Sequence, residues 1–429
     1  MKVPGGFATL RLLFAKRDYC LYVVGHWVGN IGLWIQRVAI AWLAWQLTES
    51  FSWLGIIAFA DQAPSIVFGL VAGAVVDRVD YMKLLRLTQL LTFVHSALLA
   101  ILALTGSMDI WLLLLLTLVR GVLTAFNRPS RLTVVYNLVG RDLLAPAVAF
   151  NALIFNSSRF FGPAIGGAIM AVVELGWSFA AAAVATVVFS ICLQLIHMAP
   201  IPPRQKERRS ILSEAGDGVR YAMRHAGISL QFWILFAVAV FARPITDLLP
   251  GYTADVFGQD SSGLALLLTC HGLGAMAGGA LMTSRSGGVQ GLTSVMLLSV
   301  LFMAAVLLLF AINSNFLIGC FLVAAIGGGF IVQGISNQTL IQYAVDPDLR
   351  GRVVSLYGLI ARGAPAIGAL AMGVAADHLG RHVPIAVGAA LCLALWLWAW
   401  RQRRAMAAAL ETSPEAGKTQ TRGTPGDDG

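Results

Sequence analysis

The 429-residue chain is 58% hydrophobic and only 12% charged, whereas a soluble domain carries about 25% charged residues. This composition excludes a soluble fold and indicates a polytopic membrane protein, because about 20 consecutive apolar residues form one spanning helix. The formal net charge of +9 does not indicate nucleic-acid binding, since the basic residues gather in the short connections between apolar segments. The five cysteines are scattered without the spacing of a metal or redox site.

Twelve apolar segments of spanning length follow one another along the chain, at residues 20–45, 51–76, 84–105, 110–132, 143–172, 177–198, 228–252, 262–284, 291–312, 316–344, 351–376 and 383–400. Their long, continuous apolar character argues against a transmembrane β-barrel, whose strands are short and alternate. Residues 7–14 are compatible with a short interfacial helix or a loose tail. The first eighteen residues lack the apolar core and cleavage site of a signal peptide, so we expect none.

The longest polar interruption, at 199–227, predicts a boundary in the middle of the chain. Within it, residues 211–224 have the pattern of an amphipathic helix that two glycines weaken. We therefore predict an N-terminal six-helix bundle at 1–198, a cytoplasmic linker at 199–227 and a C-terminal six-helix bundle at 228–404. The remaining residues, 405–429, have the composition of a disordered cytoplasmic tail.

A short internal repeat relates the two halves. The sequence Pro-Ala-Ile-Gly occurs at 163–166 and again at 365–368, about half the chain apart, and each copy follows an arginine, Arg159 or Arg362. Membrane proteins built from two similar halves bind their substrate between the halves and expose it alternately to the two sides. The repeat therefore favours a transporter.

The basic residues predict the orientation. They gather on one side of the predicted spans, in the terminal, second, fourth, sixth, eighth and tenth connections, whereas the opposite connections carry only Arg381 and five acidic residues, Glu49, Asp109, Glu174, Asp255 and Asp260. The positive-inside rule places both termini in the cytoplasm, as does the even number of spans. We expect a multi-pass protein of the inner (plasma) membrane.

The connection after the second segment contains Gly73, Asp77, Arg78 and Lys83. This pattern resembles the loop motif between the second and third helices of the major facilitator superfamily, with Asp80 at a position where that family has glycine. The resemblance implies an all-α fold with twelve transmembrane helices in two pseudo-symmetric six-helix bundles. It also implies that this motif forms a cytoplasmic gate that holds the halves together when the transporter opens outward. A plain positive-inside anchor is the alternative.

Two further motifs extend the resemblance over residues 15–400. The fifth segment resembles the helix-five motif of the antiporter branch, although Ser158 replaces a glycine; its members here are Gly162, Pro163, Gly166 and Gly167. Close helix packing alone is the alternative explanation. Arg120 resembles the arginine of the helix-four motif, which is associated with proton coupling. Within the superfamily, the chain is most similar to the drug and siderophore exporters that include the enterobactin exporter and the macrolide efflux pumps.

Ionisable residues inside the spans require a reason, because each costs at least about 2.5–3.5 kcal/mol at the bilayer centre. Asp61 is the first proton-coupling candidate, since a partly desolvated carboxylate can bind and release a proton near neutrality. Arg37 lies at a similar depth and is its expected ion partner; a permanent Asp61–Arg37 pair that only fixes packing is the alternative. Asp247 is the second candidate, four residues after Arg243 and so on the same helix face.

Uncharged amides, an aromatic residue and two arginines inside the spans are candidates to line a substrate cavity: Trp34, Asn127, Asn151, Asn156, Arg159, Gln333, Asn337, Gln338 and Arg362. Amides can bind varied polar groups without demanding one charge. For any single aromatic residue, packing or lipid contact is the competing role.

These observations predict a secondary transporter that exports a bulky small molecule, a drug or siderophore, by alternating access and proton antiport. The expected partners are this substrate, protons and the lipid bilayer, and we expect a monomer with no cofactor, no metal and no nucleic acid. A proton symporter or a lysolipid flippase of the same fold remains open, because fold alone does not fix function. A non-transporting sensor or scaffold predicts dispensable intramembrane charges, and a membrane enzyme would need a clustered catalytic set that the sequence lacks.

Overall fold

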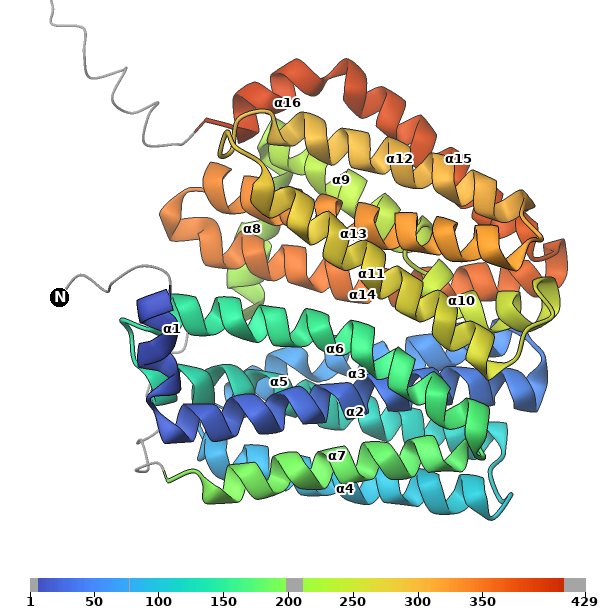
Figure 1. Cartoon of the computed structure of the whole chain (residues 1–429). Helices are drawn as coiled ribbons and strands as arrows, with labels where there is room; N and C mark the ends of the chain where they lie inside the picture. Colours follow the sequence, from blue (N-terminus) through green and yellow to red (C-terminus); the bar gives the residue numbers. More distant parts are fainter. Residues whose placement is uncertain (1–6, 77, 198–210, 413–429) are drawn as a thin grey trace, which may run out of the picture. The chain divides into compact units, whose positions relative to one another are not determined.

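The computed structural model describes residues 7–76, 78–197 and 211–412, and all regular elements in these residues are helical (Figure 1). The chain divides into two compact units. The first contains α1–α7 together with residues 247–272, and the second contains α8, α9 and the chain from residue 273 onward.

The first unit is a bundle of six long helices with one short helix before them. α2 packs along α7 and α6, α4 packs against α7 and α5, and α3 packs mainly on α5. The apolar spacing of these segments explains the helices, whose bounds are α1 Phe7–Phe14, α2 Arg17–Thr48, α3 Phe51–Val76, α4 Tyr81–Leu104, α5 Ile110–Val139, α6 Leu144–Val172 and α7 Gly176–Leu195.

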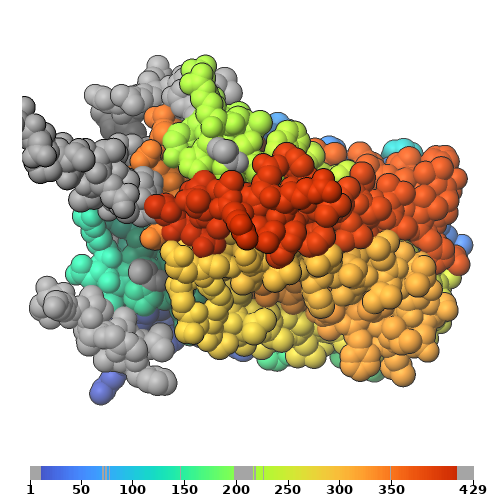
Figure 2. Space-filling model, turned by 90° about the horizontal axis from the view of Figure 1, so that it is seen from above, coloured from blue at the N-terminus to red at the C-terminus, as the bar shows by residue number. Residues whose placement is uncertain are grey.

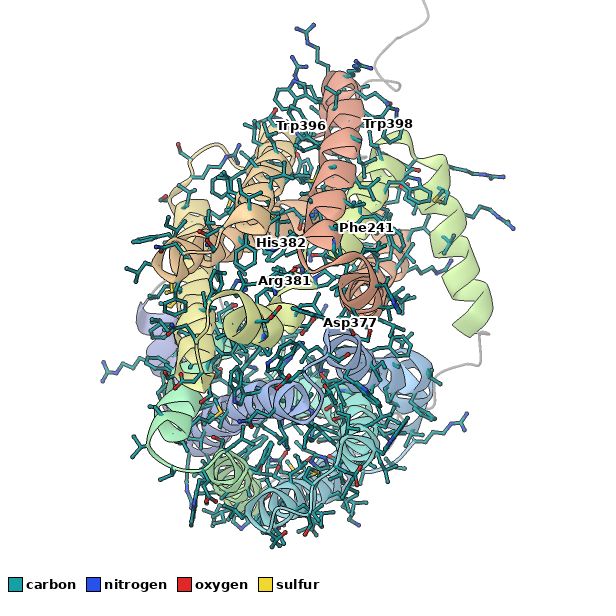
Figure 3. All side chains as sticks on the ribbon, turned by 90° about the vertical axis from the view of Figure 1, so that its right-hand side faces the viewer. Phe241, Asp377, Arg381, His382, Trp396 and Trp398 are labelled. Atoms are coloured by element: carbon teal, nitrogen blue, oxygen red, sulfur yellow. The ribbon has the colours of Figure 1, made fainter. Side chains whose placement is uncertain are left out.

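The second unit contains the linker helix and most of the second half of the chain. α9 packs against α14 and α15, and α12 packs against α13 and α15. The helices are α8 Ile211–Arg224, α9 Ala226–Phe241, α10 Ile245–Gly251, α11 Ser261–Ser284, α12 Leu292–Ile312, α13 Phe316–Ala344, α14 Pro347–Leu379, α15 His382–Arg401 and α16 Arg403–Leu410, with α10 and the start of α11 extending into the first unit. Arg381 and His382 lie at the turn between α14 and α15, with Trp396 and Trp398 further along α15 (Figure 3).

Helix packing repeats between the units. The contacts of α4 with α7 and of α2 with α6 in the first unit correspond to those of α12 with α15 and of α9 with α14 in the second. The repeated Pro-Ala-Ile-Gly sequence explains part of this correspondence. A Cβ on Gly166 would lie 3.4 Å from Ile35 of α2, and a Cβ on Gly368 would overlap the carbonyl oxygen of Val240 of α9. In both units, the last glycine of the repeat brings its helix close to the first spanning helix of that half.

Ten helices or helix pairs of the described chain are long and apolar enough to cross a membrane. α2 and α6 have spanning length, at 32 and 29 residues, but are not among them. Both carry several polar side chains near the middle, including Asn30 and Arg37 on α2 and Asn151 and Arg159 on α6. These polar side chains lower the hydropathy of both helices below that of their neighbours.

The seventh predicted segment is not one continuous helix. α9 ends at Phe241, α10 begins at Ile245, and a π-helical turn follows at Tyr252–Val256. Pro244 accounts for the break, because its ring clashes with the preceding turn and it has no N–H to donate. Beyond the break, the segment packs in the first unit, where the rings of Phe51 and Tyr252 lie 5.3 Å apart.

Two short predicted helices form: residues 7–14 are α1 and residues 211–224 are α8. The prediction of disorder from residue 405 is wrong for the residues described there, because α16 continues to Leu410 and packs on α9, α12 and α13. The rest of the predicted tail, 413–429, and part of the predicted linker, 198–210, lie outside the described residues. The domain boundaries at 198 and 227 therefore stay predictions.

Glu411 connects the end of α16 to the start of α12. Its carboxylate accepts hydrogen bonds from the backbone N–H groups of Gly291, at 2.8 Å, and Thr293, at 2.9 Å. α12 has no side-chain cap of its own, whereas Asp80 caps α4 in the first unit. Figure 2 shows the red C-terminal helices beside the yellow-orange α12. Glu411 thus supplies from the end of the chain the acceptor that helix N-termini require.

Replacing Glu411 with alanine is expected to lower the unfolding free energy by about 1–2 kcal/mol, because the N–H groups of Gly291 and Thr293 at the start of α12 lose their acceptor. Thermal unfolding of the purified protein in detergent measures the change. Glu411→Gln retains one acceptor oxygen, so its unfolding free energy is expected to lie between those of the wild type and Glu411→Ala. Glu174→Ala removes an exposed carboxylate and serves as the control. Equal melting temperatures for Glu411→Ala and the control would contradict the capping role.

Candidate functional site

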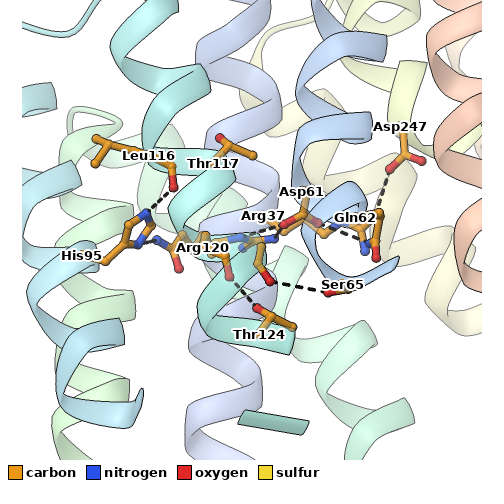
Figure 4. Close-up of polar contacts among 12 residues, drawn as sticks. Arg37, Asp61, Gln62, Ser65, His95, Leu116, Thr117, Arg120, Thr124 and Asp247 are labelled. Carbon is orange, nitrogen blue, oxygen red and sulfur yellow. Dashed lines mark hydrogen bonds and ion pairs between the residues drawn. The ribbon is translucent and has the colours of Figure 1, made fainter. Parts of the chain in front are cut away.

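Asp61 and Arg120 form a buried ion pair inside the first unit. Arg120 of α5 donates to Asp61 Oδ1 of α3 from Nε at 3.0 Å and from Nη2 at 2.7 Å (Figure 4). The side chains are only 13% and 9% exposed. Gly121 allows this approach, since a Cβ there would lie 2.9 Å from the carbonyl oxygen of Asp61 and 2.8 Å from Pro64.

A second ion pair joins Arg37 of α2 to Asp247 of α10, with Nη2 3.0 Å from Oδ1. Its side chains are 33% and 17% exposed, so this pair is more accessible than the first. The predicted Asp61–Arg37 pair is therefore wrong in its partners: Asp61 bonds to Arg120, and Arg37 bonds to Asp247. Arg37 still lies near enough to Asp61 for their charges to interact, so the two pairs form one group of two cations and two anions.

A histidine extends the polar network away from the ion pairs. His95 Nε2 lies 2.9 Å from the carbonyl oxygen of Leu116, and Nδ1 lies 3.3 Å from the amide nitrogen of Gln36. A carbonyl can only accept, so the ring proton belongs on Nε2, and Nδ1 accepts from Gln36. Both ring nitrogens of a neutral His95 are thus satisfied, which fits a structural role.

A helix break separates Arg243 from Asp247. The sequence placed it on one helix face with Asp247, but Arg243 lies in the break between α9 and α10, so no continuous helix carries both residues. In the second unit, its Nη1 donates to the carbonyl oxygen of Ala361 at 3.3 Å, and its guanidinium lies 5.6 Å from the ring centre of Phe330. The break at Pro244 falls between the two residues, and their shared face stays a prediction.

Trp34 is the centre of an aromatic and cationic group on α2 and α6. The guanidinium groups of Arg37 and Arg159 each lie 5.3 Å from its ring centre, and the ring of Phe155 lies 6.1 Å away. Phe155 is exposed, as is Trp27, whose Nε1 donates to Ser157. The predicted cavity residues Trp34 and Arg159 therefore lie together, and Asn151 and Asn156 occupy the same helix as Phe155.

Three of the amides predicted to line the cavity are buried. Asn127 donates to Thr88 at 3.1 Å, and Gln333 and Asn337 are 1% and 0% exposed on α13. Asn127 is therefore held within the first unit, whereas the cavity role of Gln333 and Asn337 stays a prediction. Gln338 and Arg362 are exposed, and Arg362 Nε donates to the carbonyl oxygen of Gly358.

The predicted gate motif is described in part. Arg78 and Lys83 are exposed, Asp77 lies outside the described residues, and nothing is described for Gly73 beyond its place in α3. Asp80, which the family pattern does not explain, accepts from the N–H groups of Met82 and Lys83 at 2.9 and 3.1 Å and begins α4. An aspartate just before an apolar periodic segment is a helix-start signal, and sequence reasoning missed it.

The helix-five motif brings α6 close to its neighbours. A Cβ on Gly162 would meet the backbone carbonyl of Ile31 at 3.1 Å and would overlap Trp34, and one on Gly167 would overlap Ala265. Pro163 lies within α6 between these contacts. The glycines thus set the distance of α6 from α2 and so position Trp34.

Solved structures establish the fold. The fold matches a peptide transporter with a TM-score of 0.73 at 11% identity, covering 95% of this chain and 97% of that one. It also matches a nucleoside transporter with a TM-score of 0.68 at 12% identity, covering 91% of this chain and 99% of that one. This all-helical membrane protein has the major facilitator fold, and it is a secondary transporter rather than an enzyme.

Sequence comparison gives the family. Residues 14–419 match the family described as "Transmembrane secretion effector", and the chain belongs to this family of the major facilitator superfamily. The staphyloferrin A transporter of Staphylococcus aureus is 27% identical over 86% of this chain and 89% of its own length. Macrolide efflux protein A of Streptococcus pyogenes is 23% identical over 81% of this chain and 86% of its own length. The enterobactin exporter of Salmonella typhi is 23% identical over 85% of this chain and 87% of its own length.

Proposed function

We propose that the protein exports a siderophore or drug-like small molecule across the plasma membrane in exchange for protons. The buried Asp61–Arg120 pair is the observation that carries the proton exchange. The similarity to siderophore and macrolide exporters over more than four fifths of the chain supports the substrate class and the direction.

The ion pairs provide a physical basis for coupling. With Asp61 ionised, the two arginines and two aspartates balance each other. When Asp61 takes up a proton, Arg120 keeps its charge in a nearly dry site without a counter-ion, which is unfavourable by several kcal/mol. The protonated state therefore favours a conformation in which Arg120 is hydrated or finds another anion. Proton binding and release at Asp61 would then shift the unit between two conformations.

The group around Trp34 is the proposed substrate contact in the first unit. It combines an aromatic surface with the cations Arg37 and Arg159, and Arg37 also bonds to Asp247. A substrate that interacts with Arg37 would compete with Asp247 for this arginine. Because Arg37 and Asp61 belong to the same group of charges, such competition links substrate binding to the protonation state of Asp61.

The proposed orientation has both termini in the cytoplasm, with the substrate entering from that side. The basic connections support it through the positive-inside rule. Several of these cations also satisfy helix C-termini: Lys16 donates to the carbonyl oxygen of Val139 at 2.9 Å, and Arg86 to that of Leu193 at 2.9 Å.

Transport in everted membrane vesicles tests the function. A radiolabelled macrolide, staphyloferrin A and enterobactin are offered separately while an acidic lumen is imposed. At least one probe is expected to accumulate, and a protonophore should abolish the accumulation. Vesicles without the protein are the control. Accumulation that persists after the pH gradient has collapsed would contradict proton exchange, and uptake only by right-side-out vesicles would contradict export.

A further inference from the structure

A further arginine of the first unit, Arg131, is partly buried and lies eleven residues after Arg120 on α5, away from the two ion pairs. Arg131 of α5 donates from Nη1 to His26 Nδ1 at 3.2 Å and to Asn30 Oδ1 at 3.4 Å, both on α2. Its guanidinium lies 4.9 Å from the ring centre of Phe189. Tyr22 stacks on His26 with ring centres 5.2 Å apart. The guanidinium thus contacts polar side chains of α2 and an aromatic ring of α7.

This cluster has no carboxylate. Among the described residues, Arg131 forms no ion pair, and its Nε is buried without a hydrogen-bond partner. Buried charges in proteins are normally paired, because leaving one unpaired costs several kcal/mol. Both arginines of the proposed coupling group, Arg37 and Arg120, have an aspartate partner. Arg131 is therefore a site that lacks an anion.

The cluster also lacks a hydrogen-bond acceptor. His26 Nδ1 accepts from Arg131, so the ring proton of a neutral His26 lies on Nε2, and Nε2 faces the amide of Asn30 at 3.1 Å. In one orientation of the Asn30 amide, the oxygen accepts from Arg131 and the NH₂ group faces the N–H of His26. In the other orientation, the oxygen accepts from His26 and the NH₂ group faces the N–H groups of Arg131. In either orientation one N–H group lacks an acceptor.

We propose that Arg131, His26 and Asn30 form a binding site for an anionic oxygen group, a carboxylate of the exported compound. No described contact uses the Nε–Nη2 edge of the guanidinium, and this is the edge that binds a carboxylate through two parallel hydrogen bonds. The carboxylate would supply the missing counter-charge and an acceptor for the unpartnered Nε of Arg131. The inference rests on the proposed function, since it names the chemical class that the exporter takes.

Citrate binding to the purified full-length protein in detergent tests the site, with titration calorimetry at constant ionic strength. The wild type is expected to bind citrate saturably, and Arg131→Gln to weaken binding roughly tenfold or more. Asn30→Asp places a carboxylate beside Arg131, so it should weaken citrate binding as strongly without lowering the melting temperature. Arg220→Gln, which changes an exposed arginine on α8, is the control and should bind like the wild type.

Two results would overturn the proposal: no citrate binding by the wild type, or equal binding by the wild type, Arg131→Gln and Asn30→Asp. A parallel titration with phosphatidylglycerol separates substrate from lipid, because Arg131-dependent lipid binding without citrate binding would assign the site to a headgroup instead. No pH gradient is present in these titrations. Their failure therefore leaves proton exchange untouched, and a failure of the vesicle experiment leaves anion binding untouched.

Discussion

Replacing Asp61 with asparagine is expected to reduce transport driven by a pH gradient by roughly a hundredfold or more, since an amide cannot take up the proton. It also leaves Arg120 buried without a counter-ion, so the unfolding free energy should fall by about 3–5 kcal/mol. Vesicle uptake measures the first effect and thermal unfolding in detergent the second. Asp109→Asn is the matched control, because Asp109 is an exposed N-cap that asparagine replaces well.

A double variant separates coupling from stability. Asp61→Asn with Arg120→Gln removes both charges, so most of the lost stability should return, because neutral replacements of a buried ion pair are often tolerated. Gradient-driven transport should remain absent. If the stable double variant transports at the wild-type rate, the pair has only a structural role, and the proton must bind elsewhere. Asp247 is then the next carboxylate to test, because its partner Arg37 lies near Asp61.

The extents of the helices could be predicted from the sequence because they depend on local properties. The segment 316–344 coincides with α13, and Pro244 by itself indicates the interruption of the seventh segment. The internal repeat is also visible, because the Gly166 and Gly368 positions recur with the same neighbours in the chain. An unbroken apolar run needs no information from distant residues to form a helix in a bilayer.

The partners of the charged residues could not be predicted, because they depend on how each helix is rotated about its axis. Depth alone predicted Arg37 as the partner of Asp61. The structure joins Asp61 to a residue 59 positions away and joins Arg37 to one 210 positions away. The same limit applies to Asn127, whose side chain donates to Thr88 of α4. Glu411 was missed because a single carboxylate in an alanine-rich segment does not reveal which helix it caps.

α11 packs closely on α13 through small residues. Gly274 and Gly278 on α11 face Ala324 and Gly328 on α13, two small-xxx-small patterns in contact. A Cβ on Gly274 would overlap the carbonyl oxygen of Ala324, and one on Gly278 would lie 2.6 Å from that of Gly328. Membrane helices that lack a hydrophobic driving force between them associate through such close backbone contact. Neither carbonyl can move without moving its helix.

Gly274→Leu is therefore expected to prevent folding, with the yield of monodisperse protein in size-exclusion chromatography falling to background. Gly274→Ala should lower the unfolding free energy by roughly 1–3 kcal/mol, or more if the helices cannot separate. Gly279→Ala on the same helix is the matched control, because its Cβ would meet only Ile331 at 3.8 Å. This control should be neutral or stabilising by up to about 1 kcal/mol, since alanine favours helix over glycine. Equal melting temperatures for the two alanine variants would show that α11 and α13 do not depend on this contact.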